Sequence, residues 1–252
     1  RLAANSFEAS FAAEADKLRS ALLTSLSHDL KTPLASILGS AGTLRDYTAL
    51  LPEADRTELL SNVIDEAERL NRFIANLLDM TRIEAGAALV TASPHFIGDI
   101  IGSALRRAGP LLERHRVELS LPEDLPMVRI DPVLFEQVLF NLLDNARKYA
   151  PEGTGILIRV WPAEDRVMVQ IVDEGPGIPP ADLPKIFDIF YRIRKRDRVQ
   201  AGTGLGLSIS KQIIEAHNGR IWAENRHGPA DADGKPTVVG ARFVVRLPAP
   251  SP

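Results

Sequence analysis

The segment Ser25–Leu34 places a histidine beside groups that could make it a nucleophile. Apolar residues recur with helical spacing here, and His28 points nearly opposite them at about 100° per residue. Asp29 can accept a proton from one ring nitrogen and raise the basicity of the other. Thr32, one turn further along, shares the face of His28 and can hold a water molecule. Since an exposed histidine is more often a plain surface residue, the segment alone leaves both interpretations open.

A second polar group lies on one face of a predicted helix. Asn141, Asn145 and Lys148 are spaced at i, i+4 and i+7, so they share that face. A carboxamide oxygen is a good ligand for Mg²⁺, and a lysine one turn away can meet a phosphate. The alternative is the ordinary polar side of an amphipathic helix.

Two glycine-rich segments follow. Asp173 comes directly after a β-prone strand, and Gly175 and Gly177 behind it would let the backbone approach a flat ligand, although a plain Gly-Pro turn would look the same. The segment Gly202–Leu207 opens a predicted helix, where free backbone amides favour a phosphate. Its G-x-G-x-G spacing is not the dinucleotide-binding pattern, and the chain has no P-loop.

Composition narrows the class of protein. The 252 residues are 45% hydrophobic and 25% charged with a net charge of −3, which is typical of a soluble protein with one or two domains. This charge gives no indication of a nucleic-acid partner. The absence of cysteine excludes disulfides and thiolate chemistry and fits a reducing compartment. No apolar run reaches membrane-spanning length and no signal peptide is present. Because the chain begins at Arg1, we expect it to be a piece of a longer protein.

The first part of the chain predicts two helices joined by a turn near residues 47–55. Positions Leu60, Val63, Ala67, Leu70, Ile74 and Leu77 of the second helix form a heptad seam. Two helices cannot bury two seams by themselves, so we expect a homodimer. Packing against the rest of the same chain is the alternative.

Beyond residue 94 the pattern changes to mixed α/β. Helices are predicted over 96–108, 132–149 and 205–217, with Asp131 as an N-cap before Pro132. Strands are predicted over 116–121, 127–130, 155–161, 166–172, 220–225 and 238–247. A long loop with a short helix is predicted over 174–203, and Gly228–Lys235 is predicted to be a hairpin loop.

Taken together and in this order, the motifs resemble the sensor histidine kinases of two-component systems over essentially the whole chain. Residues 25–34 match their phosphoacceptor box, 141–149 their N box, 173–177 their G1 box, 187–190 their F box and 202–207 their G2 box. The stretches 76–86 and 131–143 look most like the potassium-responsive KdpD type. The resemblance implies a dimerising phosphotransfer hairpin over residues 1–88, a four-helix bundle as the dimer. An ATP-binding α/β sandwich of the Bergerat type would follow over residues 89–252.

The resemblance also implies a role for individual residues. His28 would be the phosphorylated nucleophile, Asp29 its base, and Thr32 the residue that positions water for phosphatase activity. Asn145 would hold Mg²⁺, and Asp173 would bind the adenine amino group. The ATP-binding residues that it implies are Asn141, Asn145, Lys148, Tyr149, Asp173, Gly175, Gly177, Ile178, Phe190, Arg192, Gly202, Thr203, Gly204, Leu205, Gly206 and Leu207.

The implied cofactors are ATP and Mg²⁺, and the implied partners are a second copy of the chain and the receiver domain of a response regulator. No contact with nucleic acid or membrane is expected of this fragment, although its parent would be a membrane-anchored sensor with a cytoplasmic kinase portion. Signalling of the potassium or osmotic type is expected. Two alternatives stay open. A Bergerat ATPase of another kind has no reason to carry the segment 27–33, and a pseudokinase that only docks partners would tolerate loss of Asn145 or the glycines.

Overall fold

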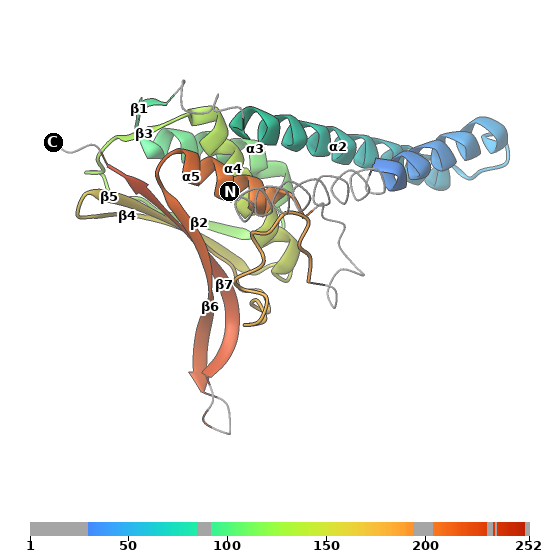
Figure 1. The fold of residues 1–252 in the computed structure, drawn as a ribbon. Coiled ribbons are helices and arrows are strands. Elements are labelled where there is room, and N and C mark those ends of the chain that lie inside the picture. Colours follow the sequence, from blue (N-terminus) through green and yellow to red (C-terminus); the bar gives the residue numbers. More distant parts are fainter. Residues whose placement is uncertain (1–29, 85–91, 194–203, 231–233, 235, 250–252) are drawn as a thin grey trace, which may run out of the picture. The chain divides into compact units, whose positions relative to one another are not determined.

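The computed structural model describes residues 30–84, 92–193, 204–230, 234 and 236–249 (Figure 1). The chain divides into two compact units, residues 1–75 and 76–252. Within the described ranges, no helix has the length and apolar character needed to cross a bilayer.

The first unit is a helical hairpin, as the sequence predicts. A helix over residues 30–47 is followed by a turn, and α2 (Glu53–Glu84) runs back and continues into the second unit. Asn62 Nδ2 donates a hydrogen bond to Ser40 Oγ at 3.3 Å, which links the two helices. Several large apolar side chains remain exposed on the single hairpin: Leu34, Leu38, Leu60, Ile64 and Ile74. Of the predicted seam, Val63 and Leu70 are half-buried, so one edge of the seam packs within the hairpin and the other is open.

The second unit is built on a five-stranded sheet in the order β2-β4-β5-β7-β6. Its strands are β2 (Arg116–Ser120), β4 (Gly155–Ala163), β5 (Arg166–Val172), β6 (Arg220–Ala230) and β7 (Pro236–Pro248). The β2–β4 pair is parallel and the other pairs are antiparallel. A separate two-stranded sheet joins β1 (Ser93–His95) to β3 (Val128–Ile130).

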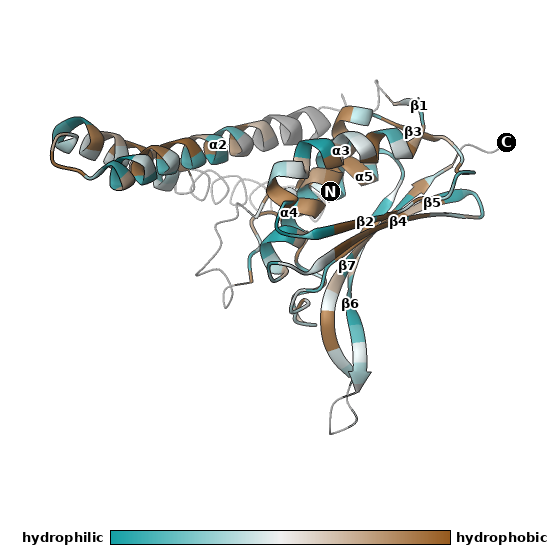
Figure 2. Ribbon diagram, turned by 180° about the vertical axis from the view of Figure 1, so that it is seen from behind, coloured by the Kyte–Doolittle hydropathy of each residue, from teal (hydrophilic) through white to brown (hydrophobic). Residues whose placement is uncertain are grey.

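Three helices cover one face of this sheet: α3 (Ile97–Leu112), α4 (Pro132–Tyr149) and α5 (Gly206–Ala216) (Figure 1). The strand residues that face them alternate with residues of the opposite face. The buried set is Ile156, Ile158, Val160, Val167, Val169, Ile171, Ile221, Phe243, Val245 and Leu247. Figure 2 shows the hydrophobic colouring along β4 and its neighbours that this core requires.

Helix α4 begins where the sequence predicts. The Asp131 carboxylate accepts hydrogen bonds from the backbone N–H groups of Val133 at 2.9 Å and Leu134 at 3.1 Å, and Pro132 occupies the first helical position. His217, at the end of α5, accepts a hydrogen bond at Nε2 from the Asp131 backbone N–H at 2.9 Å. The start of α4 is therefore tied to the end of α5.

The structure differs from the sequence prediction in three local features. Strand β1 was missed because Pro94 lies inside it. The short helix predicted within 174–203 is absent from residues 174–193, where Pro179, Pro180 and Pro184 allow only isolated turns such as the Ile186 N–H to Asp182 C=O bond at 3.0 Å. The hairpin loop predicted over 228–235 is shorter, because β6 continues to Ala230.

Candidate active site

The polar face of α4 contacts the start of α5. Asn141 Nδ2 donates to the Gly206 carbonyl at 3.1 Å and to Ser210 Oγ at 3.4 Å. A Cβ at Gly206 would lie 3.5 Å from Asn141 Cγ, which is ordinary van der Waals contact. The predicted N-box asparagine and the predicted phosphate-binding segment are therefore neighbours.

The other end of α4 contacts the loop that follows β5. A Cβ at Gly175 would lie 2.9 Å from the Tyr149 carbonyl oxygen and 2.8 Å from Asp173 Oδ1. Any side chain at this position would force the loop away from α4, so glycine is required here. Three motifs that are far apart in sequence thus meet along a single helix.

Asp173 is buried at the end of β5, with 3% of its surface exposed. Its Oδ1 accepts hydrogen bonds from the backbone N–H groups of Gly175 at 2.8 Å and Ala241 at 3.1 Å. Burial raises the pKa of this carboxyl, against the opposing effects of the two hydrogen bonds and of the Arg226 charge. Because Oδ1 is engaged twice, Oδ2 is the oxygen that can accept from a ligand.

Asn225 of β6 fixes the next part of the same loop, and sequence reasoning missed it. Its Nδ2 donates to the Ile178 carbonyl at 2.7 Å, and its Oδ1 accepts from the Ile178 N–H at 2.7 Å. Gly177 has a φ of +69°, and a Cβ there would lie 2.8 Å from Asn225 Oδ1 and against Val238 of β7. The strand pair β6–β7 therefore holds the loop in one conformation. No local pattern indicates this role, since Asn225 lies 47 residues from its partner.

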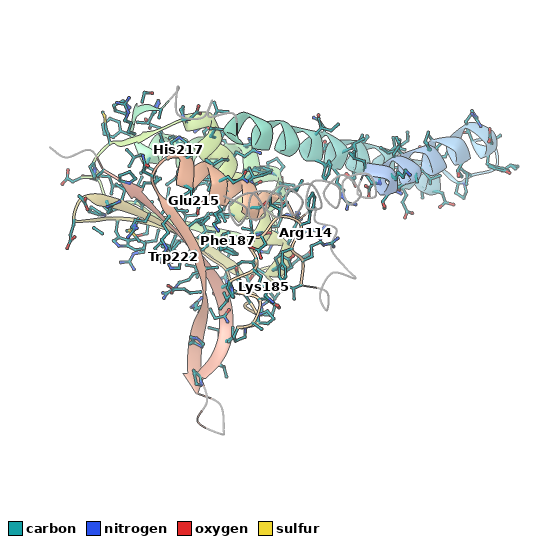
Figure 3. All side chains as sticks on the ribbon, in the orientation of Figure 1. Arg114, Lys185, Phe187, Glu215, His217 and Trp222 are labelled. Carbon is teal, nitrogen blue, oxygen red and sulfur yellow. The ribbon has the colours of Figure 1, made fainter. Side chains whose placement is uncertain are left out.

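The predicted F-box and G2-box segments also meet. The Phe190 N–H donates to the Gly204 carbonyl at 3.1 Å, and both residues have positive φ, +62° and +70°. A Cβ at Gly204 would lie 2.9 Å from the Phe190 backbone. Phe187, labelled in Figure 3, packs its ring edge-on against Phe243 of β7 at 6.4 Å. The segment before α5 is thus anchored to the sheet through Phe187.

Lys148 is paired within α4. Asp144 forms ion pairs with Lys148 and, at 2.9 Å, with Arg147. Burial alone would raise the pKa of the Asp144 carboxyl, but the two cations outweigh it and the pKa lies below its ordinary value. The Asn145 side chain, on the same face, makes no hydrogen bond with any other described residue. Its carboxamide is therefore available to a ligand.

The other residues that the sequence analysis assigned to the site differ in their exposure to solvent. Ile178 and Leu205 are buried, Leu207 is half-buried, Tyr149 has 42% of its surface exposed, and Thr32 and Arg192 are exposed. His28, Asp29, Gly202 and Thr203 lie outside the described residues.

The donor set indicates how a metal ion could bind. Among the residues that the structure describes, no group of three His, Cys, Asp or Glu side chains could hold a metal ion. Mg²⁺ commonly takes one or two protein ligands and completes its octahedron with phosphate oxygens and water. A single carboxamide oxygen from Asn145 fits that mode of binding, provided that a phosphate ligand supplies the rest.

Comparison with known families gives two matches in separate parts of the chain. Residues 18–86 match the His Kinase A (phospho-acceptor) domain. Residues 130–251 match the histidine kinase-, DNA gyrase B- and HSP90-like ATPase family.

Individual proteins resemble most of the chain. The sensor protein KdpD of Clostridium acetobutylicum is 41% identical over 214 residues, which is 84% of this chain and 24% of that protein. KdpD of Escherichia coli is 39% identical over 228 residues, 89% of this chain and 25% of that protein. The chain thus spans about a quarter of these relatives. A solved structure of histidine kinase ThkA in complex with response regulator protein TrrA has a TM-score of 0.67 at 22% identity over 90% of this chain and 61% of that one, a likeness of fold.

Proposed function

Because the chain belongs to the sensor histidine kinases, we propose that it phosphorylates itself on His28 with ATP and passes the phosphoryl group to an aspartate of a response regulator. The observation that carries this proposal is the convergence of three motifs on α4. Asn141 contacts Gly206 at one end of that helix, and Tyr149 contacts Gly175 at the other. The ATPase family matched by residues 130–251 supports ATP as the ligand.

The base of the nucleotide would bind at the loop after β5. Asp173 Oδ2 would accept a hydrogen bond from the adenine amino group, since Oδ1 is already occupied by two backbone donors. Ile178 would offer the base an apolar contact, and Tyr149 lies at the adjoining end of α4. Gly175 and Gly177 would act indirectly, because they let the loop pack closely against α4 and the β6–β7 pair.

The phosphates would lie along α4 toward the start of α5. Asn145 would coordinate Mg²⁺, which neutralises phosphate charge when bound. Asn141 and Lys148 would face phosphate oxygens, and Lys148 would share its charge between Asp144 and the ligand. The segment Gly202–Leu207 would close over the phosphates, with Phe190 and Arg192 beside it.

In the phosphoacceptor segment, His28 would attack the γ-phosphorus through one ring nitrogen, and ADP would leave. Asp29 would take the proton from the other nitrogen. Phosphoryl transfer depends mainly on positioning and charge compensation, so little further covalent work is required of the protein. Thr32, exposed on its helix, would orient a water molecule when the protein acts as a phosphatase on its regulator.

We further propose that the hairpin, residues 1–88, forms a four-helix bundle with a second copy, and that residues 89–252 form the catalytic domain. The exposed apolar side chains of the single hairpin support a dimer, because Leu60, Ile64 and Ile74 form a stripe along α2 that a second copy would cover. The receiver domain of a response regulator would dock on this bundle. The structure of ThkA with its response regulator supports that class of partner.

The chain spans about a quarter of the KdpD relatives, which supports the proposal that it is one portion of a longer sensor. We propose that this portion is cytoplasmic and that its parent is anchored in a membrane. The similarity of the chain to the KdpD type supports a stimulus of the potassium or osmotic type.

The test is incubation of the chain with γ-labelled ATP and Mg²⁺, followed by acid and by alkali. Label on His28 should be lost in acid and survive alkali, and His28→Gln should abolish labelling while leaving nucleotide affinity unchanged. Label that persists on His28→Gln, or ATP hydrolysis with no labelled protein, would instead indicate another phosphoacceptor or an ATPase without histidine chemistry. Nucleotide binding with neither label nor hydrolysis would indicate a pseudokinase.

A further inference from the structure

The sheet face that α3, α4 and α5 leave uncovered carries three rows of side chains set by the strand register. The rows are Trp161, Met168, Arg246 and Arg220; then Ser120, Arg159, Gln170, Val244 and Trp222; then Glu118, Leu157, Val172, Arg242 and Glu224. Residues of opposite parity, such as Ile158 and Ile171, are buried beneath the helices, so the rows point the other way. These three rows form the open face.

Both tryptophans of the chain lie on the open face. Trp161 is paired with Met168, and Trp222, labelled on β6 in Figure 3, is paired with Val244. Trp222 Nε1 donates to Glu224 Oε1 at 2.7 Å, which fixes the orientation of the ring. A solvated sheet face needs only polar residues, whereas large half-buried aromatic side chains with a fixed orientation are typical of binding surfaces.

Positive charge is concentrated on the open face and its border, although the whole chain has a net charge of −3. The arginines are Arg116, Arg159, Arg166, Arg220, Arg226, Arg242 and Arg246, and the acidic residues are Glu118, Asp165, Glu174 and Glu224. Three of the arginines are paired, Arg242 with Glu224, Arg226 with Glu174 at 3.7 Å and Arg166 with Asp165 at 3.1 Å. The other four form no ion pair within the described part of the chain.

Two of the unpaired arginines lie against aromatic rings, and no described side chain forms an ion pair with them. The Arg159 guanidinium lies 5.7 Å from the centre of the Trp161 ring, and that of Arg220 lies 5.8 Å from the Trp222 ring. Nε of Arg246 is buried and has no hydrogen-bond partner among the residues that the structure describes. A buried donor without an acceptor is costly, and a bound carboxylate would satisfy it.

A hollow extends the open face toward the loop after β5. It has a volume of about 600 Å³ and is lined by residues that include Arg116, Leu157, Arg226 and Arg242. Five strands about 4.8 Å apart and three rows two residues apart give the open face a span of roughly 20 by 13 Å. That area suits a transient contact with a short protein segment.

We propose that the open face docks an acidic segment of a partner protein. Carboxylates of the segment would meet Arg159, Arg220 and Arg246, and its aliphatic side chains would lie on the two tryptophans. A nucleic acid fits less well, because its evenly spaced phosphates would meet Glu118 and Glu224 as well as the arginines, whereas a peptide can alternate carboxylates with aliphatic side chains. This site is separate from the proposed nucleotide site and does not depend on it.

The two tryptophans provide the assay, because any ligand on the open face changes the intrinsic fluorescence of the full chain. A synthetic peptide of Glu, Asp and Leu should change this fluorescence in a saturable way that weakens with added salt. The double variant Arg159→Glu with Arg220→Glu should reduce the affinity at least about tenfold. Arg129→Glu is the matched control, since Arg129 is exposed on β3 outside the five-stranded sheet, and it should leave binding unchanged.

Several results would overturn the proposal. These are no fluorescence or calorimetric response to the acidic peptide, equal binding of the same peptide with lysine at every acidic position, or equal loss in the Arg129 control. Binding of oligothymidylate in place of the peptide would assign the face to nucleic acid. Circular dichroism of each variant separates loss of the site from loss of the fold. Each half of the open face is tested by replacing one tryptophan, Trp161→Phe or Trp222→Phe, and using the fluorescence of the other.

Discussion

Replacing Asn225 with alanine should weaken ATP binding although Asn225 would not touch the nucleotide. The carboxamide holds both backbone polar groups of Ile178 at 2.7 Å, next to Gly177 in its left-handed conformation. Alanine removes both hydrogen bonds and leaves the packing of Val238 on Gly177 to hold the loop. The loop should then populate conformations in which the base does not fit beside Asp173.

The magnitude follows from the two bonds. Each of the two hydrogen bonds contributes about 1 kcal/mol of net free energy, so losing both shifts the loop by about 2 kcal/mol toward its released conformations. At about 1.4 kcal/mol for each factor of ten, ATP affinity should fall by up to roughly thirty-fold, and by less where the closed loop is strongly favoured in the parent. Asn225→Asp retains the acceptor for the Ile178 N–H but not the donor to its carbonyl, so its loss should be intermediate.

The assay is calorimetric titration of the chain with ATP and Mg²⁺, with a thermal melt of each variant in the absence of nucleotide. Asn62→Ala is the matched control, because it removes one side-chain hydrogen bond within the hairpin, far along the chain from the nucleotide loop. An Asn225→Ala variant that binds ATP within about twofold of the parent would refute the reasoning. An Asn62→Ala variant with the same loss of ATP affinity would also refute it, since the effect would then be a general destabilisation of the protein.

Three further predictions concern the dimer, the buried carboxylate and the two activities. Ile64→Asp should convert the dimer to monomer in sedimentation experiments while Ser61→Asp, also exposed on α2, should not, because only Ile64 belongs to the apolar stripe. Asp173→Asn should abolish ATP binding yet raise the melting temperature at pH 7. Burial raises the pKa of Asp173 in the folded state, so the ionised carboxylate lowers the stability of the fold above that pKa. This destabilisation disappears as the pH falls through the folded-state pKa. Thr32→Ala should keep most autophosphorylation but lose about ten- to a hundredfold in regulator dephosphorylation. Asp29→Asn should lose autophosphorylation and keep regulator dephosphorylation. Label entering the kinase measures the first activity, and label leaving the regulator measures the second.

Each of these has a contrary outcome. A dimer that survives Ile64→Asp at micromolar protein would mean that the stripe faces something other than a second copy. A lower melting temperature for Asp173→Asn at neutral pH would mean that the two backbone hydrogen bonds outweigh the burial of the charge. Parallel loss of both activities in the Thr32 and Asp29 variants would mean that these residues only support the helix.

The sequence predicted those parts of the structure that depend on local chemistry. The N-cap at Asp131 and the full length of α4 followed from a capping residue, a proline at the first position and helical periodicity. Strand β5 was predicted to the residue because it is a continuous β-prone run. The i, i+4 spacing of Asp144 and Lys148 could also have indicated their ion pair, although the carboxylate competes for a lysine assigned to phosphate.

The rest depends on contacts between distant parts of the chain. Asn225 has no neighbour in sequence that marks it, because its partner is a backbone loop brought alongside by the sheet. Gly240, at φ +153°, lies against the backbone of Asp173, a constraint visible only once β7 is placed beside β5. The register that gathers both tryptophans on one face likewise has no local signal, since a shift of one residue in either strand would reverse it.

In the proposed site, helix α4 would set a length scale for the ligand. Asn141 marks its contact with α5 and Tyr149 its contact with the loop after β5, and at 1.5 Å of rise per residue these two points lie about 12 Å apart along the axis. In the proposed site, a compound must be about that long to engage both ends at once. Adenosine alone would reach only the loop, whereas a chain of phosphates would extend along the helix to Gly206 at the start of α5. The length of α4 would therefore select ligands of about that length. Removing one residue of the helix would both shorten it and rotate Asn141 away from Gly206.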